Sequence, residues 1–232
     1  MGTTIGLGVG GLAWAGYWDT DVFTDVPAAA VTGPKSARVA IVYVSGDVGF
    51  KVALGGMLAK RFADRGVPVV AINSLGFFRK QRSVADVAGL ILEATARAKA
   101  LAGADRVVLV GHSLGADVLQ AALAALPPAQ RTAIAGVVLI VPTKGLYLRI
   151  SPQEMLDIGA PDAPTLGTLQ SLDWVPVTCI YGLEEDDSPC PLLRGPNVVR
   201  VGLPGGHAMH WDVAAIAANT LHTVDKLPRK EL

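Results

Sequence analysis

One pentapeptide limits the folds open to this chain more than any other feature. Gly111-His112-Ser113-Leu114-Gly115 has the pattern G-x-S-x-G. An apolar run of strand length (106–111) leads into the serine, and a helix-like run (114–126) follows it directly. A serine in this setting is typical of a nucleophile elbow, the sharp turn that raises a hydroxyl above the edge of a sheet. We therefore expect Ser113 to be a nucleophile.

Strand-like and helix-like segments alternate along the chain. Continuous apolar runs predict strands at 38–45, 67–73, 106–111, 134–141, 177–181 and 198–201, with helices predicted at 50–65, 83–102, 114–126 and 211–224. Ser83, followed by Asp86 three residues later, is the expected cap of the second helix. This alternation predicts the α/β class, a mostly parallel sheet covered by helices on both faces. Together with the elbow, it favours the α/β-hydrolase fold.

The sequence predicts three segments of different character. Residues 1–18 contain no charged side chain and predict an apolar leader, either a secretory signal or a membrane anchor. Residues 19–37 lack periodicity and are expected to form a linker, followed by the hydrolase domain over 38–232. Within that domain, 143–174 interrupts the alternation and is either a cap over the active site or a packed surface excursion.

Composition excludes several classes of protein. Hydrophobic residues make up 51% of the chain and charged residues 17%, so extensive disorder is excluded. The 20 basic residues balance the 20 acidic ones, which argues against nucleic acid as a partner because such binding needs a basic surface. Two cysteines are too few for a four-thiolate zinc site, and we expect no metal and no cofactor.

A serine nucleophile needs a base and an acid, which in this fold follow the serine in the order acid, then histidine. His207 lies in a glycine-rich loop after the last strand and is the expected base, with His210 as the alternative. The acid is expected in the run Glu184-Glu185-Asp186-Asp187, after the preceding strand. We rank Asp187 first, Asp186 second and Glu185 third. The oxyanion hole is expected to use the amide of Leu114 and that of Asp47 or Val48.

Two cysteines flank the acidic run. Cys179 precedes it and Cys190 follows it. A disulfide between them would close a small loop and would persist only in an oxidising compartment. The alternative is a pair of buried free thiols. We favour the disulfide, which together with the apolar leader indicates an exported protein.

Four stretches of the chain resemble a known family. They are Val44-Ser45-Gly46-Asp47, the elbow with its continuation Ala116-Asp117-Val118-Leu119, the acidic run between Cys179 and Cys190, and Leu203-Pro204-Gly205-Gly206-His207. From about residue 38 to the C-terminus, the chain resembles the VirJ/AcvB virulence-protein family of periplasmic α/β-hydrolases.

The resemblance implies a substrate and a place of action. It implies hydrolysis of aminoacylated phosphatidylglycerol, notably the lysyl form, in the periplasm at the outer face of the inner membrane. The apolar leader separately suggests the N-terminus as a tether to that membrane. Asp117 could pair with the lysyl ammonium, and His112, beside the nucleophile, is the other candidate for substrate binding. Contact with the membrane surface and with secretion-system proteins is left open. The alternatives are a general carboxylesterase or thioesterase, and a non-catalytic partner of a type IV secretion system.

Overall fold

A computed structural model describes residues 10–29, 39–52, 54–150 and 160–227. Its centre is a seven-stranded sheet in the order β1-β3-β2-β4-β5-β8-β9. The strands are β1 (Phe23–Val26), β2 (Val39–Val44), β3 (Val69–Ile72), β4 (Arg106–His112), β5 (Ile134–Ile140), β8 (Val177–Gly182) and β9 (Val198–Leu203). Every neighbouring pair is parallel except β1 with β3. The predicted α/β class and mostly parallel sheet are confirmed.

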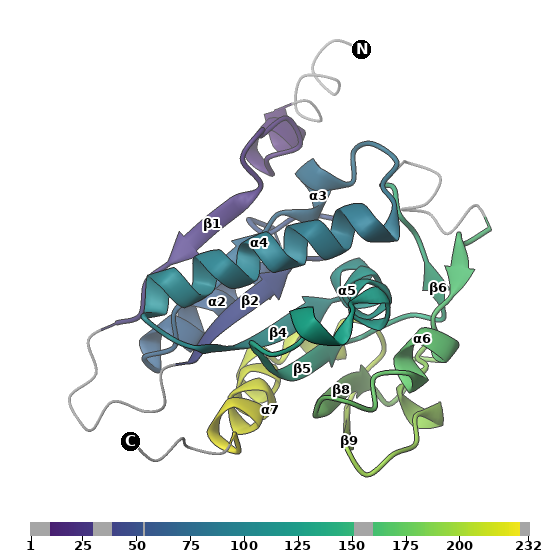
Figure 1. The fold of residues 1–232 in the computed structure, drawn as a ribbon. Helices are drawn as coiled ribbons and strands as arrows, with labels where there is room; N and C mark the ends of the chain where they lie inside the picture. Colours follow the sequence, from purple (N-terminus) through teal and green to yellow (C-terminus); the bar gives the residue numbers. More distant parts are fainter. Residues whose placement is uncertain (1–9, 30–38, 53, 151–159, 228–232) are drawn as a thin grey trace, which may run out of the picture.

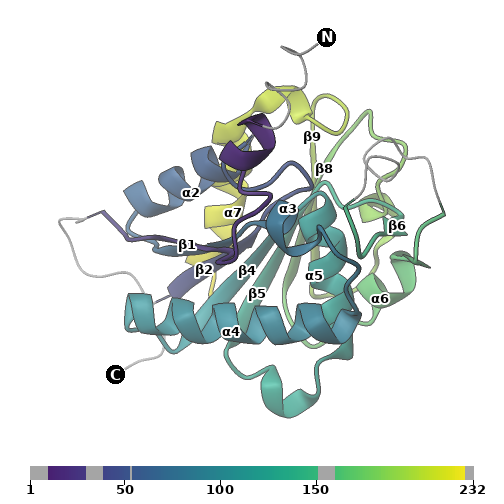
Figure 2. The ribbon, with the colours of Figure 1, turned by 90° about the horizontal axis from the view of Figure 1, so that it is seen from above.

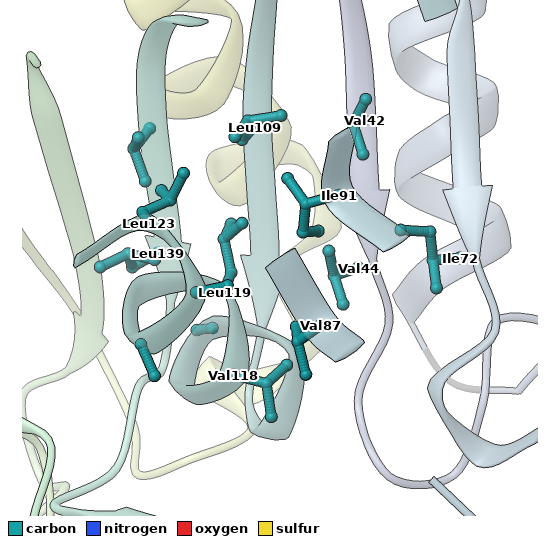
Figure 3. Packing of buried hydrophobic residues seen from close by; sticks show 14 of the residues in the cluster. Val42, Val44, Ile72, Val87, Ile91, Leu109, Val118, Leu119, Leu123 and Leu139 are labelled. Carbon is teal, nitrogen blue, oxygen red and sulfur yellow. The ribbon is translucent and has the colours of Figure 1, made fainter. Parts of the chain in front are cut away.

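Helices cover both faces of this sheet (Figures 1 and 2). One face packs against α4 (Val84–Ala102) and α5 (Leu114–Ala125), and the other against α2 (Leu54–Asp64) and α7 (Val213–Asp225). Because both faces are covered, all six residues of β2 and all seven of β5 are buried and apolar or small. Figure 3 shows the first face, where Ile91 of α4 and Leu119 of α5 pack against Leu109 of β4.

The long helix α4 begins and ends where its sequence predicts. The Ser83 hydroxyl accepts a hydrogen bond from the Asp86 amide at 3.1 Å, and the Asp86 carboxylate accepts one from the Ser83 amide at 2.8 Å. This reciprocal capping box satisfies two donors that the first turn of a helix leaves free. At the other end Gly103 has a φ of +55°, the left-handed conformation in which glycine commonly ends a helix.

The edge strand β1 corrects the expectation of a linker over 19–37. Phe23–Val26 pairs antiparallel with β3, so the sheet includes residues that precede 38. Asp25 at this edge forms an ion pair with Arg97 of α4 at 2.7 Å. A short edge strand with two adjacent polar residues, Thr24 and Asp25, lacks the continuous apolar run that identifies a buried strand. Residues 30–37 of the expected linker lie outside the described residues.

The end of the expected leader packs against the hydrolase domain. Residues 10–14 form a helix, and the Asn73 side chain donates to the carbonyl oxygens of Ala15 at 2.9 Å and Gly16 at 3.4 Å. The oxygen of the same side chain accepts from the Phe50 amide at 3.2 Å, so Asn73 joins this segment to the loop after β2. None of the helices over 10–29, 39–52, 54–150 and 160–227 is long and apolar enough to span a membrane. Residues 1–9 lie outside the described residues.

The described parts of the expected insertion at 143–174 pack against the hydrophobic core on the α4–α5 side of the sheet. The short strands β6 (Gly145–Leu146) and β7 (Ala163–Pro164) pair antiparallel, and α6 (Leu166–Gln170) follows. Four leucines of this segment, Leu146, Leu148, Leu169 and Leu172, are buried in the same cluster as α4 and α5. Its residues 151–159 lie outside the described residues.

A buried carboxyl joins α5 to this segment. Asp117 is only 2% exposed, and its two oxygens lie 2.8 Å from the Thr143 amide and 2.8 Å from the Thr143 hydroxyl. The same hydroxyl lies 3.0 Å from the Gly145 carbonyl, and its single proton cannot serve both oxygens. A protonated Asp117 would supply the second proton. Burial, and to a lesser extent the charge of Asp187, raises the pKa of Asp117 well above its ordinary value.

The two cysteines form the expected disulfide. Cys179 of β8 bonds to Cys190 at the start of a 3-10 turn (Cys190–Leu192), with an S–S distance of 1.99 Å. Both residues are fully buried. The bond closes the segment that carries the acidic run, so this segment is fixed at both ends.

The first prediction concerns the disulfide. Replacing both cysteines (Cys179→Ala with Cys190→Ala) should lower the free energy of unfolding by about 3 kcal/mol, because the unfolded chain regains the entropy of an 11-residue separation. Urea unfolding with and without reductant measures this effect. Reductant should bring the wild type down to the variant and leave the variant unchanged. Equal stabilities of the oxidised wild type and the variant would contradict the prediction.

The second prediction concerns Asp117. Its raised folded-state pKa means that the folded chain keeps a proton that the unfolded chain releases above about pH 4. Stability is therefore lost as the pH rises from there through the folded-state pKa. Asp117→Asn offers Thr143 the same donor and acceptor without a charge, so its advantage over the wild type should grow with pH. Melting temperatures across this range test the difference, with the exposed Asp186→Asn as control; parallel curves for Asp117→Asn and the wild type would refute it.

Candidate active site

Ser113 lies on the sharp turn between β4 and α5. Its backbone has φ +55° and ψ −125°, a conformation that a non-glycine residue adopts only under strain. A Cβ on Gly115 would collide with the carbonyl oxygens of Val44 and Ser45, and one on Gly111 would lie 2.6 Å from the Gly115 carbonyl. Gly115 is therefore required for α5 to approach the end of β2 this closely, and Gly111 for the first turn of α5 to pack against the end of β4. The predicted elbow geometry is present.

Three side chains from separate loops form a continuous hydrogen-bonded line. His207 Nε2 lies 3.0 Å from the Ser113 hydroxyl oxygen, and His207 Nδ1 lies 2.9 Å from Glu185 Oε2. A carboxylate at Nδ1 favours the tautomer whose proton is on that nitrogen. The other nitrogen, Nε2, can then accept the serine proton. The arrangement has the geometry of a nucleophile, a general base and an acid that orients the base.

The acid at the histidine is Glu185, and this corrects our ranking of Asp187 first and Asp186 second. After β8 the chain turns back, with the Glu185 amide donating to the Gly182 carbonyl at 3.1 Å. This turn directs Glu185 inward, with 15% of its side chain exposed, while Asp186 and Asp187 are exposed. In the described part of the chain no hydrogen bond joins Asp187 to His207; its carboxylate accepts from the Lys144 amide at 3.4 Å.

Close contact between two loop backbones brings the acid to the base. A Cβ on Gly182, at the end of β8, would collide with the carbonyl oxygens of Gly205 and Gly206. The Glu184 amide donates to the Gly205 carbonyl at 3.1 Å, and the Glu184 carboxylate accepts from the Gly205 amide at 3.3 Å. The missing side chain of Gly182 thus lets the His207 loop rest directly on the loop of Glu185.

His210, the alternative base, faces elsewhere. Its ring packs over Gly205, where a Cβ would lie 2.9 Å from His210 Cδ2. Met209, His210 and Trp211 all have positive φ, so the chain makes a left-handed turn directly after the His207 loop. The buried Met209 side chain anchors this turn in the core beneath α2 and α7. Among the described residues no hydrogen bond joins His210 to Ser113 or Glu185.

Two backbone amides near Ser113 are suited to an oxyanion. Leu114 is the first residue of α5, and the first amides of a helix have no acceptor within it. In the loop after β2, the Val48 amide already donates to the Asp47 carboxylate at 3.0 Å. We find no acceptor for the Asp47 amide within the described residues, which favours Asp47 over Val48 of the two donors expected there. A Cβ on the adjacent Gly46 would lie 3.6 Å from Ser113 Cβ, so this loop borders the nucleophile.

The two residues expected to bind substrate differ in position. His112 is half-buried beside the site, and burial first, then the nearby His207, lowers its pKa to about 4. It is therefore neutral at pH 7. Asp117, by contrast, is covered by Thr143 and presents no free carboxylate to a substrate, which corrects the substrate-binding role expected for it. The sequence predicted that Asp117 lies one helical turn after Ser113, but it did not predict that the segment with Thr143 covers its carboxyl group.

A metal site is a separate question. In the part of the chain that the structure describes, no three histidine, cysteine, aspartate or glutamate side chains gather closely enough to hold a metal ion. The residues around Ser113 are instead those that activate a hydroxyl and receive a negative charge.

Solved structures with this fold are α/β hydrolases. A lipase-esterase related protein from Clostridium acetobutylicum matches over 88% of this chain and 100% of its own, with a TM-score of 0.61 and 13% identity. MenH from S. aureus matches over 89% and 99%, with a TM-score of 0.63 and 13% identity. Est1E from Butyrivibrio proteoclasticus matches over 88% and 95%, with a TM-score of 0.59 and 15% identity. These likenesses confirm the α/β-hydrolase fold.

Sequence comparison identifies the family. A search of curated proteins found no match. The family model described as bacterial virulence protein (VirJ) matches residues 38–227, which include the elbow, the acidic run and the His207 loop. The match thus covers every side chain placed in the candidate site. The chain belongs to the VirJ family of bacterial virulence proteins.

Proposed function

We propose that this protein is a serine ester hydrolase with Ser113, His207 and Glu185 as its catalytic triad. The observation that carries the proposal is the unbroken line of hydrogen bonds, 3.0 Å from Ser113 to His207 and 2.9 Å from His207 to Glu185. The strained elbow supports it as well, because backbone strain of this kind concentrates at functional sites. The hydrolase fold sets the same expectation.

The mechanism uses these groups in two half-reactions. His207 Nε2 takes the Ser113 proton as the hydroxyl oxygen attacks the ester carbonyl carbon, and Glu185 stabilises the imidazolium that forms. The amides of Leu114 and Asp47 receive the negative charge on the carbonyl oxygen, a contribution of about 3 kcal/mol per donor in comparable sites. His207 then returns the proton to the leaving alcohol. Water, deprotonated by the same histidine, releases the acid from Ser113.

We propose an aminoacyl ester of phosphatidylglycerol, the lysyl form above all, as the substrate. Family membership supports this choice, and so does the charge beside the site. Glu184, Asp186 and Asp187 are exposed next to Glu185, and these four acids outnumber the one lysine that contacts the run, Lys144, so the run as a whole would attract a lysyl ammonium. The neutral His112 adds no positive charge that would repel this group.

The periplasm is the proposed location. A disulfide persists in an oxidising compartment, and Cys179–Cys190 supports export on that ground. The apolar run at the N-terminus would tether the protein to the inner membrane and bring its site to the lipid surface. We also propose that the protein binds secretion-system proteins, and membership of the virulence-protein family is the sole support for this.

A second enzyme reading is a general carboxylesterase or thioesterase. It is favoured by one of the structural neighbours, which is named a lipase-esterase related protein. A non-catalytic partner of a type IV secretion system is the third reading. The aligned Ser113, His207 and Glu185 weigh against that reading, because a scaffold does not need them in line.

The third prediction tests the substrate. Vesicles containing lysyl-phosphatidylglycerol should yield free lysine and phosphatidylglycerol, measured by mass spectrometry, and Ser113→Ala and His207→Ala should abolish this turnover. Turnover of p-nitrophenyl butyrate but not of the lipid would favour the general esterase. A fluorophosphonate probe separates enzyme from scaffold: it should label the wild type and not Ser113→Ala. A wild type that resists the probe and hydrolyses no ester would refute the enzyme reading.

The fourth prediction tests the acid. Glu185→Gln should lower kcat/KM by about 100-fold or more, because the histidine loses the carboxylate that stabilises its protonated form. Asp187→Asn should lower it by far less, and Asp186→Asn, the neighbour in sequence, serves as the matched control with kcat/KM near that of the wild type. Steady-state kinetics on p-nitrophenyl butyrate gives the comparison. A larger loss in Asp187→Asn than in Glu185→Gln would restore the acid that we ranked first.

A further inference from the structure

Lys144 reaches the acidic run from the segment between β5 and β6. Its side-chain Nζ donates to the Asp186 carbonyl oxygen at 2.6 Å. Its backbone amide lies 3.4 Å from Asp187 Oδ2, a weaker second contact with the same run. The first bond is short and charge-assisted, which places it among the stronger hydrogen bonds in proteins. Lys144 was not singled out in the sequence, because nothing in its local pattern indicates a contact 42 residues away.

The segment that carries Lys144 is itself held firmly. The residue before Lys144, Thr143, contacts the buried Asp117 through both its amide and its hydroxyl. Thr165 contacts the segment twice, since its hydroxyl donates to the Thr143 carbonyl at 2.6 Å and its amide donates to the Lys144 carbonyl at 3.1 Å. The backbone of Lys144 is therefore fixed to α5, the helix that begins just after Ser113.

The acidic run has few other attachments at this point. Upstream, Glu184 pairs with the Gly205 backbone and Glu185 closes the turn to Gly182. Downstream, the disulfide fixes Cys190. Between Glu185 and Cys190, Lys144 supplies the cross-segment hydrogen bonds among the described residues. Without them, the chain directly after Glu185 would depend on its own turn for its direction.

We propose that Lys144 is a positioning residue that holds Glu185 in line with His207 through the Asp186 carbonyl. The proposal rests on the triad assigned above. Fixing the Asp186 carbonyl restricts the backbone rotation of the residue directly after Glu185, and so restricts where the Glu185 carboxylate can point. The lysine acts through the backbone and does not touch the reacting atoms.

The geometry suits this role better than substrate binding. The Lys144 ammonium is already committed at 2.6 Å to a carbonyl on the acidic run, next to two exposed carboxylates. A cationic aminoacyl group would be repelled by it, so Lys144 offers that group no contact. The Asp117–Thr143 contacts on the far side give the lysine a rigid base from which to act.

The fifth prediction compares variants of Lys144. Lys144→Met should lower kcat on p-nitrophenyl butyrate by about 10- to 100-fold with KM nearly unchanged, because misplacement of a catalytic group affects the transition state more than ground-state binding. It should also weaken the low-field proton NMR signal of the His207 Nδ1–Glu185 hydrogen bond. Lys144→Arg keeps a charged donor and should restore most of both. Lys60→Met, which removes an exposed lysine of α2 paired with Asp64, is the control for loss of one surface charge.

Each outcome decides the matter. Unchanged kcat and an unchanged NMR signal in Lys144→Met would overturn the proposal. A raised KM with kcat and the NMR signal retained would also overturn it, because Lys144 would then be a substrate contact. If the wild type hydrolyses no ester but shows the NMR signal, and Lys144→Met loses that signal, the positioning role stands. Only the proposed esterase activity is then refuted. If the methionine variant melts more than about 5 °C lower, Lys144→Leu, which also removes the donor, supplies the same comparison.

Discussion

Strands β4, β5, β8 and β9 hydrogen-bond in parallel register, so the loops that follow β4, β8 and β9 emerge at one edge of the sheet. Each of these loops carries one residue of the site: Ser113, Glu185 or His207. The serine and the histidine are 94 residues apart in the sequence. Parallel pairing alone leaves the ends of β8 and β9 about one strand spacing apart, and those of β4 and β8 about two, because β5 lies between them. Gly182 lets the acid loop touch the His207 loop, and on the other side of Ser113 Gly115 lets α5 touch the end of β2.

Local patterns predicted much of this architecture. Three features depend on only a few adjacent residues, and each lies where it was expected: the cap at Ser83, the elbow at Ser113 and the glycine-rich loop of His207. The edge strand β1 was missed because it is short, half-exposed and outside the apolar runs. The acid that contacts His207 was ranked wrongly because four acids in a row are equivalent in sequence. A turn closed by the Gly182 carbonyl decides which of them points inward, and such a turn has no signature among the acids themselves.

The contacts behind the site are the least visible in sequence. Asp117, Thr143, Lys144 and Thr165 meet through hydrogen bonds between segments more than 20 residues apart. Asp117 in particular resembles a solvent-facing residue in the first turn of a helix, where a negative charge is favourable. Burial instead raises its pKa, and its hydrogen bonds to Thr143 link the elbow helix to the segment that bears Lys144. A balanced net charge thus conceals one buried carboxyl and four acids that are concentrated in one run beside the histidine.

The burial of the Cys179–Cys190 bond has a consequence for the order of assembly. Both sulfur-bearing residues are fully enclosed once the chain has folded, so an oxidant or an isomerase has no access to them in the finished domain. The bond must therefore form while the region after β8 is still open. Because Glu185 lies between the two cysteines, its side chain reaches its final position at the same stage of folding at which the two thiols are oxidised. A chain that closes with its thiols still reduced would have to reopen before an oxidant could repair it.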